Sequence, residues 1–153
     1  MSSTNIDYVE TYFENPVLTK IHGEPTYWTL KLIKDELKSN ASAVTTEIGG
    51  GAHGHLGLVL TPAEYATVSA VPYVRPVHPG ALVIAPGTTQ HETSRLREEH
   101  KKAIKLIRET VDVERALIKQ VVASMDAQYL KELRNQASNS IDIPLHDVLQ
   151  HLR

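Results

Sequence analysis

The fold is decided mainly by the stretch TTQHETSRLREEHKKAIKLIRETVDVERALIKQVVASMDAQYLKEL, from Thr88 to Leu133. Apolar side chains recur through it at helical spacing, and polar side chains fill the positions between them. The pattern predicts one long helix, or two helices in line, from residue 89 onward. Its apolar stripe, which we expect in the core, comprises Ile104, Ile107, Val111, Ile118, Val121, Val122 and Met125.

The end of the chain carries two further helical signals. Asp126-Ala127-Gln128 predicts a new helix with Tyr129, Leu130 and Leu133, and the polar residues 135–142 end it. A last helix is expected from Pro144 onward. Nothing after this helix covers its apolar face, so we expect the face to take part in self-association. The residues of this face are Leu145, Val148, Leu149 and Leu152.

The first part of the chain predicts a flexible N-terminal arm over residues 1–15, held, if at all, by Tyr8, Tyr12 and Phe13. A helix is expected over about 25–39, because Pro25 suits a first helical turn. The apolar residues of this helix lie along one face, which is the predicted core face. They are Trp28, Leu32, Ile33 and Leu37.

Two other segments are marked by proline. Thr61 and Glu64 flank Pro62 with the spacing of a capping box, which predicts a short helix over about 62–70. Prolines then recur at 72, 76, 79 and 86, and neither a helix nor a strand ladder continues through such spacing. Residues 71–88 are therefore expected to form an extended, Pro-rich surface loop.

The glycine-rich stretch GGGAHGHLGLVL, from Gly49 to Leu60, raises a choice between a turn and a ligand site. Short apolar runs flank it, and apolar residues alternate after the glycines, so it predicts a β-hairpin over about 44–60. The residues expected to form the turn and its contacts are Gly49, Gly50, Gly51, His53, Gly54, His55 and Gly57.

A metal site in this stretch is the alternative. His53 and His55 are two residues apart, so on a strand both would project to one face, and His22, His78 or a carboxylate would supply a third ligand. No acidic cluster lies beside them in the sequence, and we therefore expect no metal and no cofactor. A phosphate-binding loop is disfavoured as well, because the glycines lead into an apolar run rather than a helix with Lys and Ser or Thr.

The composition and motifs of the sequence argue against catalysis and against strong binding of nucleic acid. There is no cysteine, and the formal net charge is −2. No Gly-x-Ser-x-Gly motif occurs. The pairs His100 with Glu98 and His146 with Asp147 are typical of a solvated helix face rather than of a catalytic pair. We therefore expect that the chain is not an enzyme. The basic run from Arg95 to Lys105 is interleaved with glutamates and predicts an ion-paired helix face. RNA is expected to bind this chain only indirectly or weakly.

Three stretches together resemble the Gag polyprotein of Copia-type LTR retrotransposons. They are residues 16–44, the stretch IGGGAHGHLGLVLTPAEY from Ile48, and residues 116–152. The resemblance implies a mainly α-helical capsid-like domain over 16–153, with its helical part over about 89–153, that self-associates into a shell around element RNA without catalysis. It also implies virus-like particles in the cytoplasm of a eukaryotic host and no membrane partner.

Two alternatives remain open on the sequence. The chain could be a small metal- or ligand-binding protein built around His53, His55 and His78. It could also be a domesticated Gag that serves the host as an RNA-carrying shell or regulator.

Overall fold

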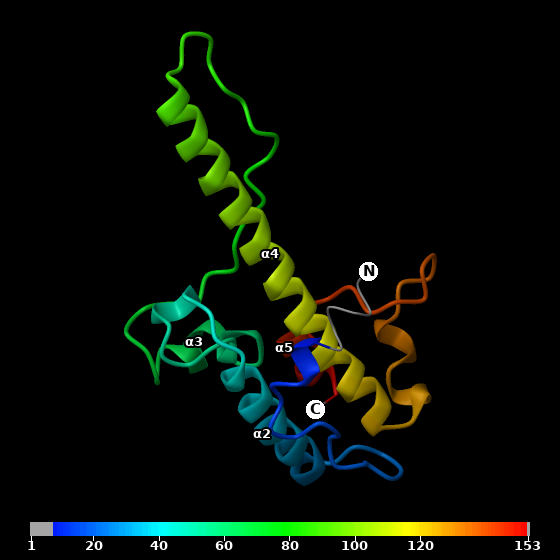
Figure 1. Ribbon diagram of the computed structural model, residues 1–153. Helices are drawn as coiled ribbons and strands as arrows, with labels where there is room; N and C mark the ends of the chain where they lie inside the picture. Colours follow the sequence, from blue (N-terminus) through cyan, green and yellow to red (C-terminus); the bar gives the residue numbers. More distant parts are fainter. Residues whose placement is uncertain (1–7, 153) are drawn as a thin grey trace. The chain divides into compact units, whose positions relative to one another are not determined.

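The structure, a computed structural model, describes residues 8–152 and is mainly α-helical, as predicted. Among these residues the one β-type pairing is an isolated antiparallel bridge between Arg134 and Ile141. Figure 1 shows the elements. In chain order they are α2 (Tyr27–Ala43), η1 (Ile48–Gly50), η2 (Leu56–Leu58), α3 (Pro62–Tyr65), α4 (Gln90–Ser124), η3 (Ala127–Tyr129), η4 (Lys131–Leu133) and α5 (Leu145–His151).

The chain divides into two compact units. The first, called the core unit below, comprises Met1–Val74 and Asp112–Arg153, and the second, called the 75–111 unit, is Arg75–Val111. Helix α4 contributes residues to both units. The expected helix from residue 89 is therefore present as one continuous α-helix, while its first and second parts belong to different units.

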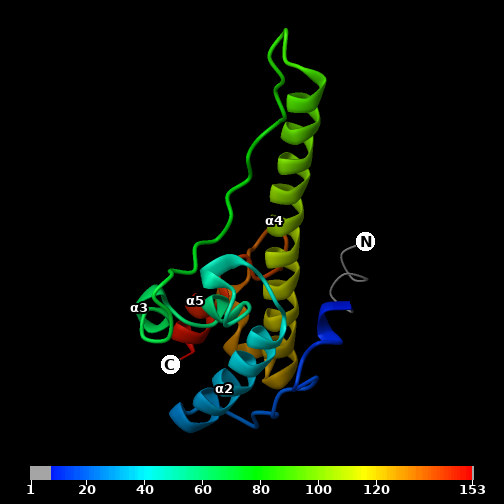
Figure 2. The same ribbon diagram turned by 60° about the vertical axis from the view of Figure 1, so that its left-hand side comes forward.

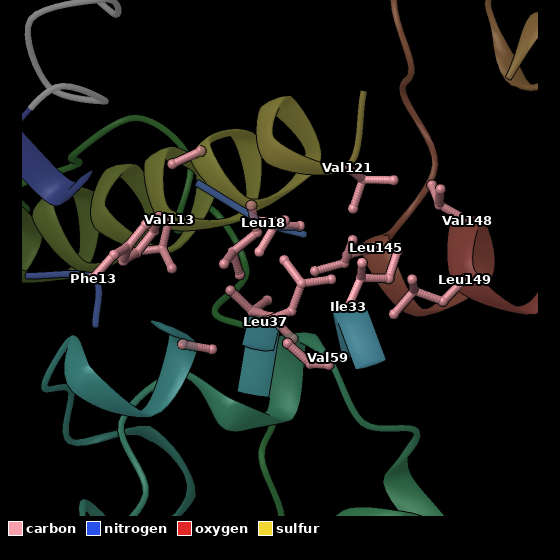
Figure 3. Close-up of a cluster of buried hydrophobic side chains, with 14 of the residues drawn as sticks. Phe13, Leu18, Ile33, Leu37, Val59, Val113, Val121, Leu145, Val148 and Leu149 are labelled. Atoms are coloured by element: carbon pink, nitrogen blue, oxygen red, sulfur yellow. The ribbon is translucent and has the colours of Figure 1, made fainter. Parts of the chain in front are cut away.

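A single large hydrophobic cluster holds the core unit together. It is built from α2, the second part of α4, α5, and the segments before α2 and around η2 (Figure 3). Removing these side chains from water is the main favourable contribution to folding. The labelled members are Phe13, Leu18, Ile33, Leu37, Val59, Val113, Val121, Leu145, Val148 and Leu149.

Helix α2 starts at Tyr27 because Thr26 closes its first turn. The Thr26 side chain accepts a hydrogen bond from the backbone N–H of Thr29, and the Thr29 hydroxyl accepts one from the N–H of Thr26. The helix buries Leu30, Ile33 and Leu37. The predicted core face was wrong in part, since Trp28 and Leu32 are exposed. A rotation of the buried face around the helix by about one residue accounts for the difference.

Helix α5 packs into the core of its own chain. Leu145 and Val148 are fully buried, Leu149 is buried, and Leu152 packs against the same cluster. The backbone N–H of Leu145 also donates to the Glu114 carboxylate of α4 at 3.2 Å. The expectation that this apolar face is uncovered and available to a second copy is therefore wrong. Residues from α2 and α4, distant in the sequence, cover it.

The predicted hairpin over 44–60 is not formed. Two single 3₁₀ turns, η1 and η2, take its place, and neither flanking run is a strand. Positive φ angles at Gly49, Gly50, Gly51 and Gly54 turn the backbone repeatedly, which no ladder of paired strands would allow. The leucines after the glycines serve two clusters, because Leu58 packs in the main core and Leu56 and Leu60 pack around Tyr65.

Residues 8–15 of the expected arm pack against the core, in part through Phe13, one of the three residues that the sequence offers for this, and residues 1–7 lie outside the described part of the chain. Val9 and Phe13 are buried in the main core. Asn15 joins a buried polar network: its backbone N–H donates to Asn40 Oδ1 at 2.7 Å, and its carbonyl accepts from both Asn40 and Gln120. This network ties the start of the described chain to α2 and α4.

The 75–111 unit consists of an extended segment and the first part of α4. Residues 75–89 contain no helix or strand. Within this unit the segment lies beside the helix in both views (Figures 1 and 2), and His100 Nε2 lies 2.8 Å from the carbonyl oxygen of Gly80. The apolar residues of this part of the helix, including Leu96, Ile104 and Ile107, are only half-buried. They do not belong to the core cluster.

Candidate functional site

The most unusual surface feature of the core unit is an apolar patch on α2. Trp28 is 72% exposed, Leu32 is 46% exposed, and Tyr27, 61% exposed, stands edge-on to the Trp28 ring with ring centroids 5.1 Å apart. Trp28 and Leu32 are four residues apart, so they lie one turn from each other on the same helix face. Exposed aromatic side chains grouped in this way are typical of protein–protein contact sites. We call Tyr27, Trp28 and Leu32 the α2 patch.

A groove borders the α2 patch, at Tyr27 and Lys31. It has a volume of about 490 Å³ and lies between α2, α3 with the residues before it, and α5. Figure 2 shows these three helices next to one another. Leu30, Val59 and Leu149 give the groove apolar walls. Its other lining residues are mainly polar or charged: Lys34, Asp35, Lys38, Thr61, Glu64, His146 and Gln150.

The charges at this groove are largely paired within the chain. Lys34 Nζ lies 2.9 Å from Glu64 Oε2, and Lys38 Nζ lies 3.5 Å from Asp35 Oδ1. The backbone N–H of Thr61 donates to Glu64 Oε1 at 3.0 Å, and this bond, followed by Lys34, lowers the pKa of Glu64 to about 2. Thr61 and Glu64 form the capping box of α3, as the sequence predicts. Both are therefore occupied in holding the helix.

The glycine-rich segment closes the C-terminal end of α2 instead of presenting a ligand site. The backbone N–H of His55 donates to the carbonyl of Ala41 at 2.9 Å. Gly54 has φ +53°, and a Cβ at this position would lie 2.5 Å from the carbonyl oxygens of Ser42 and Val44. A Cβ on Gly57 would overlap the Tyr73 ring. Both glycines are required because the backbone approaches its neighbours closely.

His53 and His55 do not act together. His53 Nε2 lies 3.1 Å from the carbonyl oxygen of Val68, whereas His55 is fully buried with Nδ1 at 2.8 Å from the Tyr73 hydroxyl. Burial lowers the pKa of His55 to about 4, because a charged imidazole loses its hydration there. The two histidines expected to form the hairpin turn and its contacts instead hold neighbouring segments in place.

The other sequence-predicted residues are dispersed. His78 lies in the 75–111 unit, where its Nδ1 accepts from the backbone N–H of Gly80 at 2.9 Å. Within residues 8–152 no group of three or more His, Asp or Glu side chains is placed to hold a metal ion. Leu145, Val148 and Leu149 lie in the core. Sequence reasoning missed the α2 patch, although the Trp28–Leu32 spacing was visible, because it assigned both residues to the interior.

No protein-family model, curated protein or solved structure matches the chain. In the described part of the chain, no helix is long and apolar enough to span a membrane.

Proposed function

We propose that this chain is a capsid-type assembly protein that self-associates through the α2 patch. The observation that carries the proposal is the exposure of Trp28 next to Leu32 on a helix whose opposite face is buried in the core. The mainly helical fold is compatible with the Gag resemblance of the sequence. A shell around element RNA, built in the cytoplasm of a eukaryotic host, is the function proposed for the assembly.

The occupant of the α2 patch is a second copy of the same patch. On α2, Lys31 and Asp35 carry opposite charges, and both are exposed and lie one turn apart along the edge of the patch. When two α2 helices pair antiparallel around a two-fold axis at residue 33, Lys31 of each copy lies opposite Asp35 of the other, and the two Leu32 side chains meet near the axis. Lys31 competes there with Lys38 for the Asp35 carboxylate. A self-complementary surface of this kind is the requirement for an isologous contact.

The experiment is sedimentation velocity from micromolar to millimolar protein. The parent chain is expected to gain mass with concentration, and Trp28→Ala and Leu32→Asp are expected to remain monomeric. Val17→Asp is the matched control, because Val17 is 82% exposed in the core unit and lies outside the α2 patch. A parent that stays monomeric throughout, or patch variants that associate like the control, would overturn the proposal.

A charge exchange identifies the partner surface. Lys31→Asp and Asp35→Lys are each expected to weaken association, because each places like charges opposite one another. The double variant, with both exchanges on one chain, restores the opposite charges across the two-fold axis and is expected to recover most of the association. A double variant as weak as the worse single variant would contradict the antiparallel pairing. Negative-stain microscopy of concentrated parent protein then tests for closed particles.

A further inference from the structure

The two units of the chain carry net charges of opposite sign. Residues 75–111 contain seven Lys and Arg and four Glu, a net charge of +3, whereas the rest of the chain carries −5. The sequence predicts that the basic residues of this region are neutralised by the interleaved glutamates. The structure separates those that are neutralised from those that are not.

Arg95 forms much of the ion pairing that the sequence predicts for this part of the helix. Its guanidinium lies 2.8 Å from Glu92 Oε2 and 2.6 Å from Glu99 Oε1, so one arginine occupies two of the four glutamates. Lys105 Nζ lies 3.9 Å from Glu109 Oε1, a loose contact of two solvated groups. Arg97, Lys101, Lys102 and Arg108 have no ion-pair partner among the residues that the structure describes, and Lys102 lies on a different side of the helix from the other three.

Three of these unpaired cations and the loosely paired Lys105 share one face of α4. At about 100° per residue, Arg97, Lys101, Lys105 and Arg108 fall within an arc of about 80°. All four are exposed. They extend over about 16 Å along the helix, which is long enough to contact several successive phosphates of one nucleic-acid strand. We call Arg97, Lys101, Lys105 and Arg108 the basic stripe.

The residues within and beside this arc indicate which of two anionic partners, a membrane surface or a nucleic acid, the basic stripe fits better. Gln90 and Ser94 are the other residues of the 75–111 unit within it, so the arc holds no apolar side chain. The apolar residues next to the arc, Ile104, Ile107 and Val111, are half-buried, whereas a helix that binds at a membrane surface needs an exposed apolar face beside its cations to enter the lipid. A phosphate backbone needs only cations and hydrogen-bond donors, and arginine binds phosphate oxygens with two parallel N–H groups.

We propose that the basic stripe of the 75–111 unit binds the phosphate backbone of single-stranded nucleic acid without reading its sequence. With three or four phosphate contacts, raising salt from 50 to 200 mM is expected to weaken binding about 20- to 50-fold. A single chain is expected to bind the nucleic acid with modest affinity. If the proposed self-association also occurs, many stripes on one strand raise the overall affinity without any new contact.

The test is fluorescence anisotropy of a labelled 20-nucleotide single-stranded RNA of mixed sequence, titrated with the full chain at 50 mM salt. The triple variant Arg97→Gln, Lys101→Gln, Arg108→Gln is expected to bind at least ten-fold more weakly than the parent. The matched control is Lys20→Gln, Lys131→Gln, Arg134→Gln, which removes the same charge from the core unit and is expected to change affinity less than three-fold. Circular dichroism verifies that helix content is unchanged.

Three outcomes would overturn the proposal: no binding by the parent at 100 μM protein, equal loss in the two triple variants, or displacement of the RNA by vesicles rich in phosphatidylserine. Sedimentation velocity of the protein without nucleic acid measures self-association independently of RNA binding. The stripe variant is expected to associate like the parent, and the Trp28→Ala variant is expected to bind the short RNA with parent affinity at concentrations where both are monomeric.

Discussion

Helices α2 and α5 both present apolar side chains, and their positions in the fold are the opposite of those that the sequence suggests. Trp28 and Leu32 of α2, expected in the core, are exposed, while Leu145 and Val148 of α5, expected at a contact between copies, are fully buried. Amphipathic spacing shows that a helix has an apolar face. It does not show whether the covering surface belongs to the same chain or to another one.

The largest expected effect comes from a charge on the buried face. Leu145→Asp should abolish folding or destabilise it by more than about 4 kcal/mol, since the carboxylate would be buried without a partner. The same change on the exposed face, Leu32→Asp, should shift the free energy of unfolding by less than about 0.5 kcal/mol. Chemical denaturation followed by circular dichroism measures both. A Leu145→Asp protein as stable as the parent would show that α5, and not α2, is the free face.

A smaller effect is expected where the glycine segment fixes the end of α2. Gly54→Ala should destabilise the chain by more than about 2 kcal/mol, because positive φ strain adds to the close approach of two carbonyl oxygens. Gly23→Ala is the control: its φ is +77°, and a Cβ there meets nothing within 4 Å. Equal melting temperatures for the two variants would mean that contacts at Gly54 do not hold α2 in the orientation that exposes Trp28.

Lowering the pH should decrease the free energy of unfolding through His55, which lies in the same glycine-rich segment. Its pKa is about 4 in the fold and near 6.5 when unfolded, so the unfolded chain takes up this proton at a higher pH. The stabilisation is complete above about pH 6.5 and is lost as the pH falls towards 4. The expected loss between pH 7.5 and 5 is about 2 kcal/mol. Denaturation of the parent and of His55→Phe over this range measures it, and identical slopes would assign the pH dependence to other groups.

The smallest effect on stability belongs to the centre of the α2 patch. Trp28→Ala removes a large side chain from an exposed position, so the free energy of unfolding should change by less than about 0.5 kcal/mol even though self-association is lost. Leu30→Ala, two residues away on the buried face, should cost about 2–5 kcal/mol. Thermal melts at low concentration, where both variants are monomeric, separate the two faces. Similar melting temperatures would remove the distinction between them.

The helical stripe along α4 shows the same limit of sequence reasoning within one element. Val121 and Met125 are buried in the core, as predicted, but Ile104 and Ile107 are only half-buried in the 75–111 unit. The fully buried residues Val113, Ala116 and Leu117 were not in the predicted stripe. Spacing identified the helix correctly, while the position of the core along it depends on where the other helices pack.

The sequence by itself determined the elements whose causes are local. The capping box of Thr61 and Glu64, the continuous helix after residue 89, the prolines that keep 71–88 free of regular structure, and the last helix after Pro144 all follow from near neighbours in the chain. Hydrogen bonds within a few residues and the missing N–H of proline are properties that a short window contains.

Only the tertiary structure decided which faces are free and what the glycines do. Gly54 and Gly57 are needed because of the carbonyls of Ser42 and Val44 and the ring of Tyr73, all brought close by folding. The α2 patch and the unpaired cations of the basic stripe likewise depend on which side chains pack or pair nearby. Burial and ion pairing are relations between residues distant in sequence, and periodicity along the chain carries no record of them.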